Sequence, residues 1–174
     1  MNANISPDWQ GSTRRERRII NRLLKFEETP KAIQYFAKHC DHLSDYWYWF
    51  VLGTLWVSYT GHSDLNLWRK LFNSKISNCS SSLMKPDELA IFKRFPAVFV
   101  VYRAHRKDEK DWISYTLSPK RAALFAVRRN MEIAAYEVKK LDILSYFARR
   151  GEDEILILDK TRAKFIQSIA VEEE

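Results

Sequence analysis

The stretch FPAVFVVYRAH (95–105), followed by DWISYTL (111–117), decides the fold class of this chain. Both runs are rich in β-branched and aromatic residues, and a polar segment from His105 to Lys110 stands between them, so we expect two strands joined by a turn. Before residue 74 the segments look helical instead. The chain therefore predicts an α+β protein whose strands lie in its C-terminal half.

The N-terminal half predicts helices. They are expected in four segments, which are an arginine-rich helix from residue 14, PKAIQYFAKHC from Pro30, the aromatic segment 45–60, and 63–73. Ser63 and Asp64 are suitable caps for the fourth helix. NSKISNCSSSLMKPDE (73–88) is dense in Ser, Asn and Pro and predicts a loop or linker.

The C-terminal half alternates strands with short helices. SPKRAALFAVRRN (118–130) predicts a helix with Ser118 as N-cap and Pro119 at the first helical position. Its apolar face is expected from Ala122, Leu124, Phe125 and Ala126. After it we expect a strand over 131–140, a short helix or turn over 141–150, and a final strand over 154–160.

Composition indicates a globular protein inside a cell. The chain has 174 residues, 46% of them hydrophobic, which suits one domain or one domain with a helical extension. Cys40 and Cys79 are the only cysteines, and the N-terminus lacks the apolar stretch of a signal peptide, so we expect a cytoplasmic protein. The aromatic segment 46–61 is shorter than the roughly 20 residues that span a bilayer, and no membrane partner is expected.

The chain is basic, and the excess charge is local. With 29 Lys+Arg against 22 Asp+Glu the net charge is +7, which favours encounters with polyanions. TRRERRIINRLLK (13–25) predicts an amphipathic helix with a cationic face. Its arginines are candidates for phosphate contact, and they are Arg14, Arg15, Arg17, Arg18 and Arg22. A solvated outer face is the alternative.

Two neighbouring strands carry polar residues suited to a nucleotide. Arg103 ends a strand of apolar residues, where a fixed guanidinium can grip a phosphate through two hydrogen bonds. Ser114 and Thr116 alternate along the next strand and therefore point to the same side, with Tyr115 on the other. A phosphate clamp and a hydroxyl pair are thus predicted close together.

Three consecutive acids stand before the last predicted strand, in GEDEILIL (151–158). If the backbone is extended there, Glu152 and Glu154 share a face and Asp153 does not. A carboxylate pair beside a phosphate clamp fits a nucleotide that reacts at a sugar. A solvated turn that pairs with Arg149 and Arg150 is the alternative.

These residues resemble the motifs of the ADP-ribosyltransferases, specifically the Arg-Ser-Glu class. That class has an arginine on the first core strand, a Ser-x-Thr or Ser-Thr-Ser motif on a second, and a Glu-x-Glu or Gln-x-Glu turn before a later strand. YRA with Arg103, SYT with Ser114 and Thr116, and EDE with Glu152 and Glu154 match in the same order. The resemblance covers about residues 95–160.

The resemblance implies a helical region, 1–90, packed on an ADP-ribosyltransferase-like split β-sheet domain, 91–174, with NAD in a cleft between two small sheets. The implied activity is mono-ADP-ribosyl transfer from NAD to a macromolecular acceptor, with release of nicotinamide and without a metal. Glu-x-Glu often accompanies arginine acceptors in the family, which favours a protein arginine. The helical region would complete the fold or recognise the target.

The resemblance also implies a role for each residue. Glu154 would bond the ribose 2′-hydroxyl and stabilise the oxocarbenium-like state, since a carboxylate stabilises positive charge at an anomeric carbon. Glu152 would orient or deprotonate the acceptor. Ser114 would support the nicotinamide ribose and Glu154. Arg103 would hold the pyrophosphate or ribose, and Thr116 would brace its strand.

Aromatic and metal-ligating residues give weaker indications of function. Tyr115 and Phe125 are candidates to stack on nicotinamide, although aromatic residues at such positions are more often core. The cluster AKHCDH (37–42) lacks a second pair of ligands at metal-binding spacing, so no metal site is predicted. The four glycines form no phosphate-binding loop.

Two other interpretations stay open. RNA or DNA is an alternative acceptor, because of the net charge and the arginine-rich segment. A non-catalytic module that binds nucleic acid or protein is the other alternative, with the acids as a surface turn. An intracellular chain of this kind could be a toxin, an effector or a phage protein, and the sequence does not choose among them.

Overall fold

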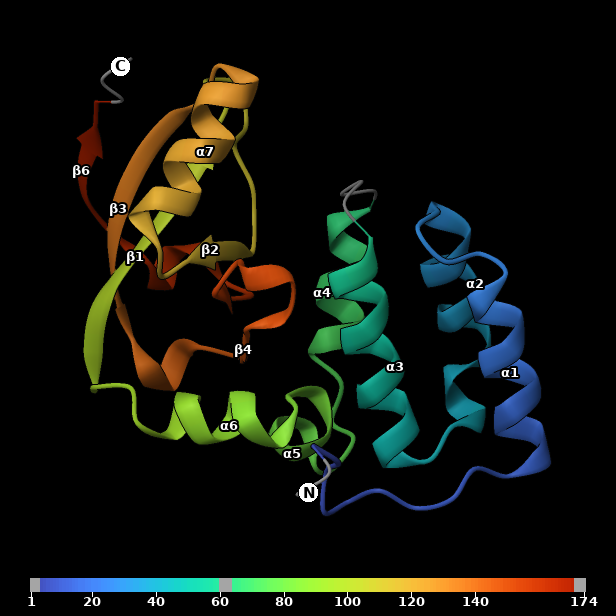
Figure 1. The fold of residues 1–174 in the computed structure, drawn as a ribbon. Coiled ribbons are helices and arrows are strands. Elements are labelled where there is room, and N and C mark those ends of the chain that lie inside the picture. The colour runs from blue at the N-terminus through green and yellow to red at the C-terminus, as the bar shows by residue number, and fades with distance from the viewer. Residues whose placement is uncertain (1–3, 60–63, 171–174) are drawn as a thin grey trace. The chain divides into compact units, whose positions relative to one another are not determined.

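Figure 1 presents the computed structural model of the chain, which describes residues 4–59 and 64–170. The chain divides into two compact units, Met1–Ala90 and Ile91–Glu174. Helices make up the first unit, and every strand of the described residues lies in the second. The α+β class expected from the sequence is confirmed.

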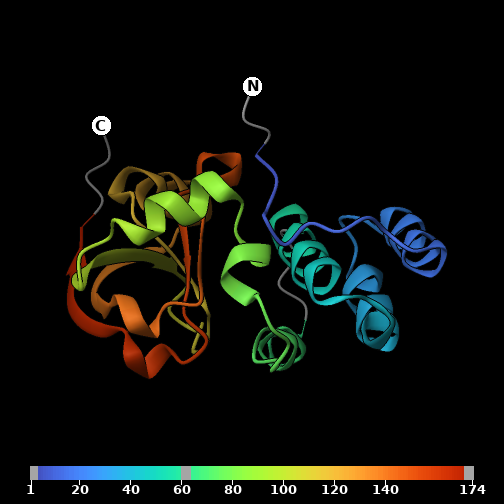
Figure 2. The ribbon, with the colours of Figure 1, turned by 90° about the horizontal axis from the view of Figure 1, so that it is seen from below.

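The first unit is built from successive helices, of which the last continues past Ala90. They are α1 (Arg14–Leu24), α2 (Pro30–His39), α3 (Asp45–Ser58), α4 (Leu65–Phe72), α5 (Cys79–Leu83) and α6 (Pro86–Lys93), with a 3-10 turn at Cys40–His42. The four helices expected over residues 14–73 are confirmed. Helix α1 lies side by side with α2, and α2 with α3 (Figure 1, Figure 2).

The caps of these helices follow the sequence in most places. Asp64 is the N-cap of α4 and accepts a hydrogen bond from the backbone N–H of Leu67, whereas Ser63 lies outside the described residues. The prediction of a loop over 73–88 is wrong in part, because α5 and the start of α6 lie there. The side chain of Glu88 explains the start of α6, since it accepts a hydrogen bond from the backbone N–H of Lys85.

Helix α3 forms the centre of the first unit. It is apolar around most of its circumference, as expected of a helix enclosed by others. Two of its buried aromatic side chains have hydrogen-bond partners: Tyr48 donates its hydroxyl to the Leu71 carbonyl at 2.8 Å, and Trp49 donates its indole N–H to the Ser77 carbonyl at 2.9 Å. In the part of the chain that the structure describes, no helix has both the length and the apolar character to cross a bilayer.

A buried carboxylate joins the start of α1 to the start of α3. Glu16 is only 3% exposed and forms a capping box with Thr13. It also accepts hydrogen bonds from the backbone N–H and the hydroxyl of Ser44, at 2.8 and 2.7 Å. Burial by itself raises the pKa of Glu16, but the bonds from Ser44 and Thr13 outweigh it and lower the pKa.

The second unit contains one antiparallel sheet. Its strands are β1 (Val98–His105), β2 (Ser114–Thr116), β3 (Glu132–Lys139), β4 (Ser145–Phe147), β5 (Glu154–Leu156) and β6 (Lys164–Ile169). Short 3-10 turns occur at Lys140–Asp142, Arg149–Gly151 and Lys160–Arg162. The strand order β4-β5-β2-β1-β3-β6 places β2 and β5 side by side although about forty residues separate them in sequence.

The middle of this sheet is narrow. Strands β1 and β3 pair along their full length, from Val98↔Lys139 to His105↔Glu132, whereas β1 and β2 share the single pair Tyr102↔Thr116. The expectation of two small sheets is therefore corrected. Hydrogen bonding joins β4-β5-β2 and β1-β3-β6 into one sheet, and the join is one residue pair wide.

Two further expectations about this half are wrong. The segment 141–150, expected as a helix or turn, contains β4, and β5 is not the final strand because β6 follows it. Helix α7 (Pro119–Arg129) is confirmed with Ser118 as its N-cap. Ala122 and Ala126 pack in a buried cluster with Ile133, but Leu124 is 49% exposed and lies off the apolar face.

Replacing Glu16 by alanine should destabilise the first unit by roughly 2–3 kcal/mol, because backbone donors at Thr13 and Ser44 lose a charged acceptor. Since the pKa of Glu16 is lowered in the folded state, its contribution is present above the ordinary glutamate pKa, about 4.3, and is lost as pH falls through the lowered pKa. Urea unfolding followed by tryptophan fluorescence reports on this unit, which holds five of the six tryptophans.

The matched control is Glu27→Gln, which changes an exposed carboxylate in the turn after α1. Its stability should stay within about 0.5 kcal/mol of the parent chain. Equal losses for the two variants would contradict the role given to Glu16.

Candidate functional site

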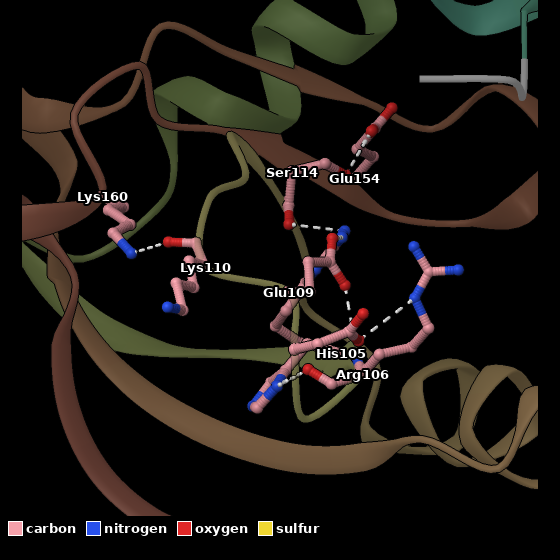
Figure 3. A network of polar contacts seen from close by, with 9 residues as sticks. His105, Arg106, Glu109, Lys110, Ser114, Glu154 and Lys160 are labelled. Carbon is pink, nitrogen blue, oxygen red and sulfur yellow. Dashed lines mark hydrogen bonds and ion pairs between the residues drawn. The ribbon is translucent and has the colours of Figure 1, made fainter. Parts of the chain in front are cut away.

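The site is centred on a serine and a glutamate that face each other across two paired strands. Strands β2 and β5 pair with the register Ser114↔Leu156 and Thr116↔Glu154, so Ser114 and Glu154 are diagonal neighbours on one face of the sheet. The Ser114 hydroxyl donates to Oε1 of Glu154 at 2.5 Å (Figure 3). Both side chains are half-buried. The structure thus brings together two residues that the sequence places forty positions apart.

Arg103 approaches this pair from the opposite face of the sheet. The pair Tyr102↔Thr116 puts Arg103 on the face of Tyr115. From there one guanidinium nitrogen donates to the Ser114 backbone carbonyl at 3.2 Å, and another pairs with the carboxylate of Glu109 at 2.6 Å. A polar chain therefore runs from Glu109 through Arg103 and the Ser114 backbone to the Ser114 hydroxyl and Glu154.

Glu109 is a site residue that the sequence analysis missed. It lies in the turn between β1 and β2, and its second oxygen accepts from the backbone N–H of Arg106 at 3.3 Å (Figure 3). The side chains of Arg103 and Glu109 are 16% and 20% exposed. An anion that binds Arg103 must therefore displace Glu109 or share the guanidinium with it. The salt bridge with Glu109 is the contact expected if Arg103 has only a structural role. Arg103 keeps its hydrogen bond to the Ser114 carbonyl as well.

The acidic turn before β5 is tied to the end of β2. Thr116 donates its hydroxyl to the Glu152 carbonyl at 2.6 Å, and the backbone N–H of Leu117 donates to the Asp153 carbonyl at 3.0 Å. The carboxylate of Asp153 accepts from the Tyr146 hydroxyl at 2.7 Å. Thr116 thus braces the turn that precedes Glu154, and Asp153 has a structural role.

The backbone of this turn is not extended, which corrects the expectation that Glu152 and Glu154 share a strand face. Glu152 has helical angles, φ −92° and ψ −14°, and Asp153 has φ +46°. Arg150 and Gly151 are also left-handed, at φ +63° and +64°. Such angles are costly for residues other than glycine and concentrate at functional sites. The Glu152 carboxylate lies 3.8 Å from Arg150, which matches the alternative of a paired surface turn.

Two cationic side chains, Arg103 and Lys160, and the ring of His105 lie against Trp112. The ring of His105 is parallel to the indole, with centroids 5.2 Å apart. The Lys160 ammonium lies 4.9 Å and the Arg103 guanidinium 5.8 Å from the same ring. Lys160 also donates to the Lys110 carbonyl (Figure 3). We name His105, Trp112, Lys160 and Arg103 the Trp112 cluster.

The Trp112 cluster suits an anionic ligand. Its positive groups share one ring, and Nε of Arg103 is buried without a hydrogen-bond partner among the described residues. A buried donor left unsatisfied costs roughly 1–3 kcal/mol, which a ligand oxygen would recover. Lys160 was missed by the sequence analysis, because nothing along the chain signals that a 3-10 turn after β5 returns to the segment before β2.

The aromatic candidates lie elsewhere. Tyr115 is 2% exposed and packs edge-on against Tyr136 with centroids 5.4 Å apart, so it is a core residue in this structure. Burial is the main cause that raises the pKa of Tyr115 to about 12. Phe125 is half-buried on α7, with the Arg129 guanidinium 5.9 Å from its ring.

The arrangement can stabilise positive charge near Glu154 and negative charge near the Trp112 cluster. No group of three or more His, Cys, Asp or Glu side chains that could hold a metal ion occurs within residues 4–59 and 64–170.

Comparisons with protein-family models, with curated proteins and with solved structures found no match.

Gly151→Ala should loosen the acidic turn by about 1–2 kcal/mol, because alanine is disfavoured at φ +64°. The added Cβ would also lie 3.0 Å from the flexible end of Arg121, which can move aside. A loss of about 1 kcal/mol makes local opening roughly fivefold more frequent, so amide hydrogen exchange of peptides covering 145–157 should become roughly fivefold faster or more. Gly11→Ala is the control, since nothing lies within 4 Å of the place that its Cβ would occupy, and exchange over 145–157 should not change.

Proposed function

We propose that this chain is an NAD-dependent mono-ADP-ribosyltransferase that moves ADP-ribose to a macromolecular acceptor. The hydrogen bond of 2.5 Å between Ser114 and Glu154 carries the proposal, because it joins two of the three motif residues and agrees with the support of Glu154 that the family resemblance implies for Ser114. Arg103, the third, contacts the backbone of the same serine. The second unit has one continuous sheet, and the one-pair join between β1 and β2 supports the finer proposal that its two three-stranded halves correspond to the split sheet of that fold.

In the proposed reaction the bond between the ribose anomeric carbon and the nicotinamide nitrogen breaks. The bonding electrons leave with nicotinamide, whose positive ring becomes neutral, and positive charge builds on the ribose. The carboxylate of Glu154 stabilises this charge, as carboxylates do in glycoside hydrolysis. An acceptor nucleophile then bonds to the anomeric carbon and loses its proton.

Ser114 and Glu152 have separate tasks in this proposal. The Ser114 hydroxyl fixes the rotamer of Glu154, so the carboxylate is positioned before the substrate arrives. Glu152 lies at the end of the turn with its side chain 32% exposed, and it is suited to orient or deprotonate the acceptor. The pair of glutamates favours a protein arginine as acceptor by resemblance. RNA or DNA is the alternative.

The Trp112 cluster is the proposed place for the pyrophosphate. Because Arg103 lies on the face of the sheet opposite to Ser114 and Glu154, the proposal requires one NAD molecule to pass the narrow join between β1 and β2. Lys160 and Arg103 supply charge over one indole ring, and Arg103 retains an unsatisfied buried donor. A guanidinium suits the geometry of phosphate oxygens. Glu109 competes for the same guanidinium, so we propose that its carboxylate yields when the substrate binds.

Glu154→Gln should lower ADP-ribosyl transfer by at least about 100-fold, because the amide keeps the shape and an acceptor oxygen for Ser114 but loses the negative charge. Transfer is measured with radiolabelled NAD and a cell lysate, followed by protease or nuclease digestion of the labelled product. Protease-sensitive label assigns a protein acceptor, and nuclease-sensitive label assigns RNA or DNA.

Glu137→Gln is the matched control, since it neutralises an exposed glutamate on β3 and should keep full transfer. Circular dichroism checks that both variants stay folded. Undiminished transfer in the Glu154 variant, or no label with the parent chain together with no NAD binding by calorimetry, would overturn the proposed function.

Changes at Arg103 and Glu109 should shift NAD affinity in opposite directions. Arg103→Ala should weaken NAD binding about tenfold or more by removing the phosphate partner. Glu109→Gln should tighten it several-fold, because a neutral amide competes less well for the guanidinium. Isothermal titration calorimetry gives both dissociation constants. Weakening by both changes would show that Glu109 serves only to position Arg103.

A further inference from the structure

The outer surface of α1 is mainly cationic. Five arginines of this helix are exposed, and they are Arg14, Arg15, Arg17, Arg18 and Arg22. The one acid of the helix, Glu16, points inward and is held by Ser44. Within the described residues none of these arginines pairs with an acidic side chain. We name them the arginine face. The exposed acids Glu27 and Glu28 follow only after the helix ends.

The arginine face opposes the stability of its own helix. Arg14, Arg18 and Arg22 follow one another at a spacing of four residues, where like charges on a helix repel. Arg14 and Arg15 lie in the first turn, where the helix dipole favours negative side chains, and the one acid of that turn, Glu16, offsets them only in part. Each such contact costs a few tenths of a kcal/mol. A polyanion bound along the face would turn these costs into favourable contacts.

Half-buried aromatic rings continue from the arginine face. The Arg22 guanidinium lies 5.2 Å from the ring of Phe26. Phe26 contacts Tyr35 with ring centroids 5.8 Å apart, and Tyr35 contacts His39 at 4.3 Å. All three rings are partly accessible. We name Phe26, Tyr35 and His39 the aromatic row. Rings beside a basic surface are the combination that holds unpaired bases and their phosphates.

The burial of α1 argues against a membrane surface as the partner. An interfacial helix inserts its apolar face among the lipids. In α1 most of that face is already packed, since Ile19 and Leu23 are 5% and 2% exposed and the helix contacts α2. Of the apolar residues of α1, Leu24 is exposed, at 58%. The charged side is what α1 presents to a partner. An anionic lipid headgroup would contact the arginines but would leave the aromatic row without a role.

We propose that the arginine face and the aromatic row together bind single-stranded nucleic acid. The arginines contact the phosphates, and the rings stack on unpaired bases. The surface lies wholly within the first unit and does not depend on the proposed transferase activity. It gives the helical unit a recognition role.

The test is fluorescence anisotropy of the full chain with a fluorescein-labelled single-stranded 20-nucleotide RNA, a DNA of the same sequence and a 20-base-pair duplex, over a salt series. The variant Arg14→Gln/Arg15→Gln/Arg18→Gln should bind the single strands at least tenfold more weakly. The slope of log affinity against log salt concentration should be shallower by about 2, because each of the three lost phosphate contacts contributes about 0.7 to the slope for a single strand. The control Lys120→Gln/Arg128→Gln/Lys164→Gln removes the same charge from exposed positions of the second unit and should lose less than twofold.

Phe26→Leu separates stacking from charge, because it keeps apolar volume and removes the ring. It should weaken single-strand binding several-fold and leave duplex binding unchanged. The proposal is overturned if the parent chain binds neither single strand, if the control triple variant loses as much as the arginine variant, or if Phe26→Leu has no effect. Binding to vesicles of anionic phospholipid without binding to the oligonucleotides would also overturn it.

Discussion

The pairing of β2 with β5 is the constraint on which the second unit's site depends. It places Ser114 beside Glu154 and sets the distance between their oxygens at 2.5 Å. The same pairing brings Thr116 and Leu117 to the acidic turn, where their hydroxyl and N–H satisfy two carbonyls. A one-residue slip of this register would turn Ser114 to the other face and separate it from Glu154.

The crowding of acids before β5 has two physical causes. Asp153 is used to hold the turn, through its carbonyl and through the Tyr146 hydroxyl. Glu154 is left at the strand entrance, half-buried and hydrogen-bonded, where a negative charge acts strongly on a bound ligand. Left-handed backbone at Arg150, Gly151 and Asp153 lets the chain turn tightly, so that Asp153 can reach Tyr146 while Glu154 begins β5. The turn therefore combines a structural acid with one suited to chemistry.

Charge is arranged differently in the two units. In the first, one buried carboxylate organises two helix starts while the arginines stay outside, so the helix presents a single sign of charge. In the second, opposite charges are interleaved, with Glu109 on Arg103 and Arg150 near Glu152. A surface of exposed cations without interleaved acids favours the binding of a long, flexible polyanion. Interleaved charges in a partly buried setting favour a small ligand that replaces one internal partner with another.

The sequence by itself determined the α+β class, the helices over 14–73 and the long strands β1 and β3, because their apolar residues recur over enough positions to establish a period. It also placed Arg103, Ser114 and Glu154 in order. It missed β4, whose three residues are too short to show a period, and β6, whose exposed edge lacks a buried face. Only the tertiary structure decided that Glu109 and Lys160 join the site, that Tyr115 is core and that the acidic turn is not extended. These depend on how segments far apart in the sequence pair and turn, which the spacing of residues within one segment does not specify.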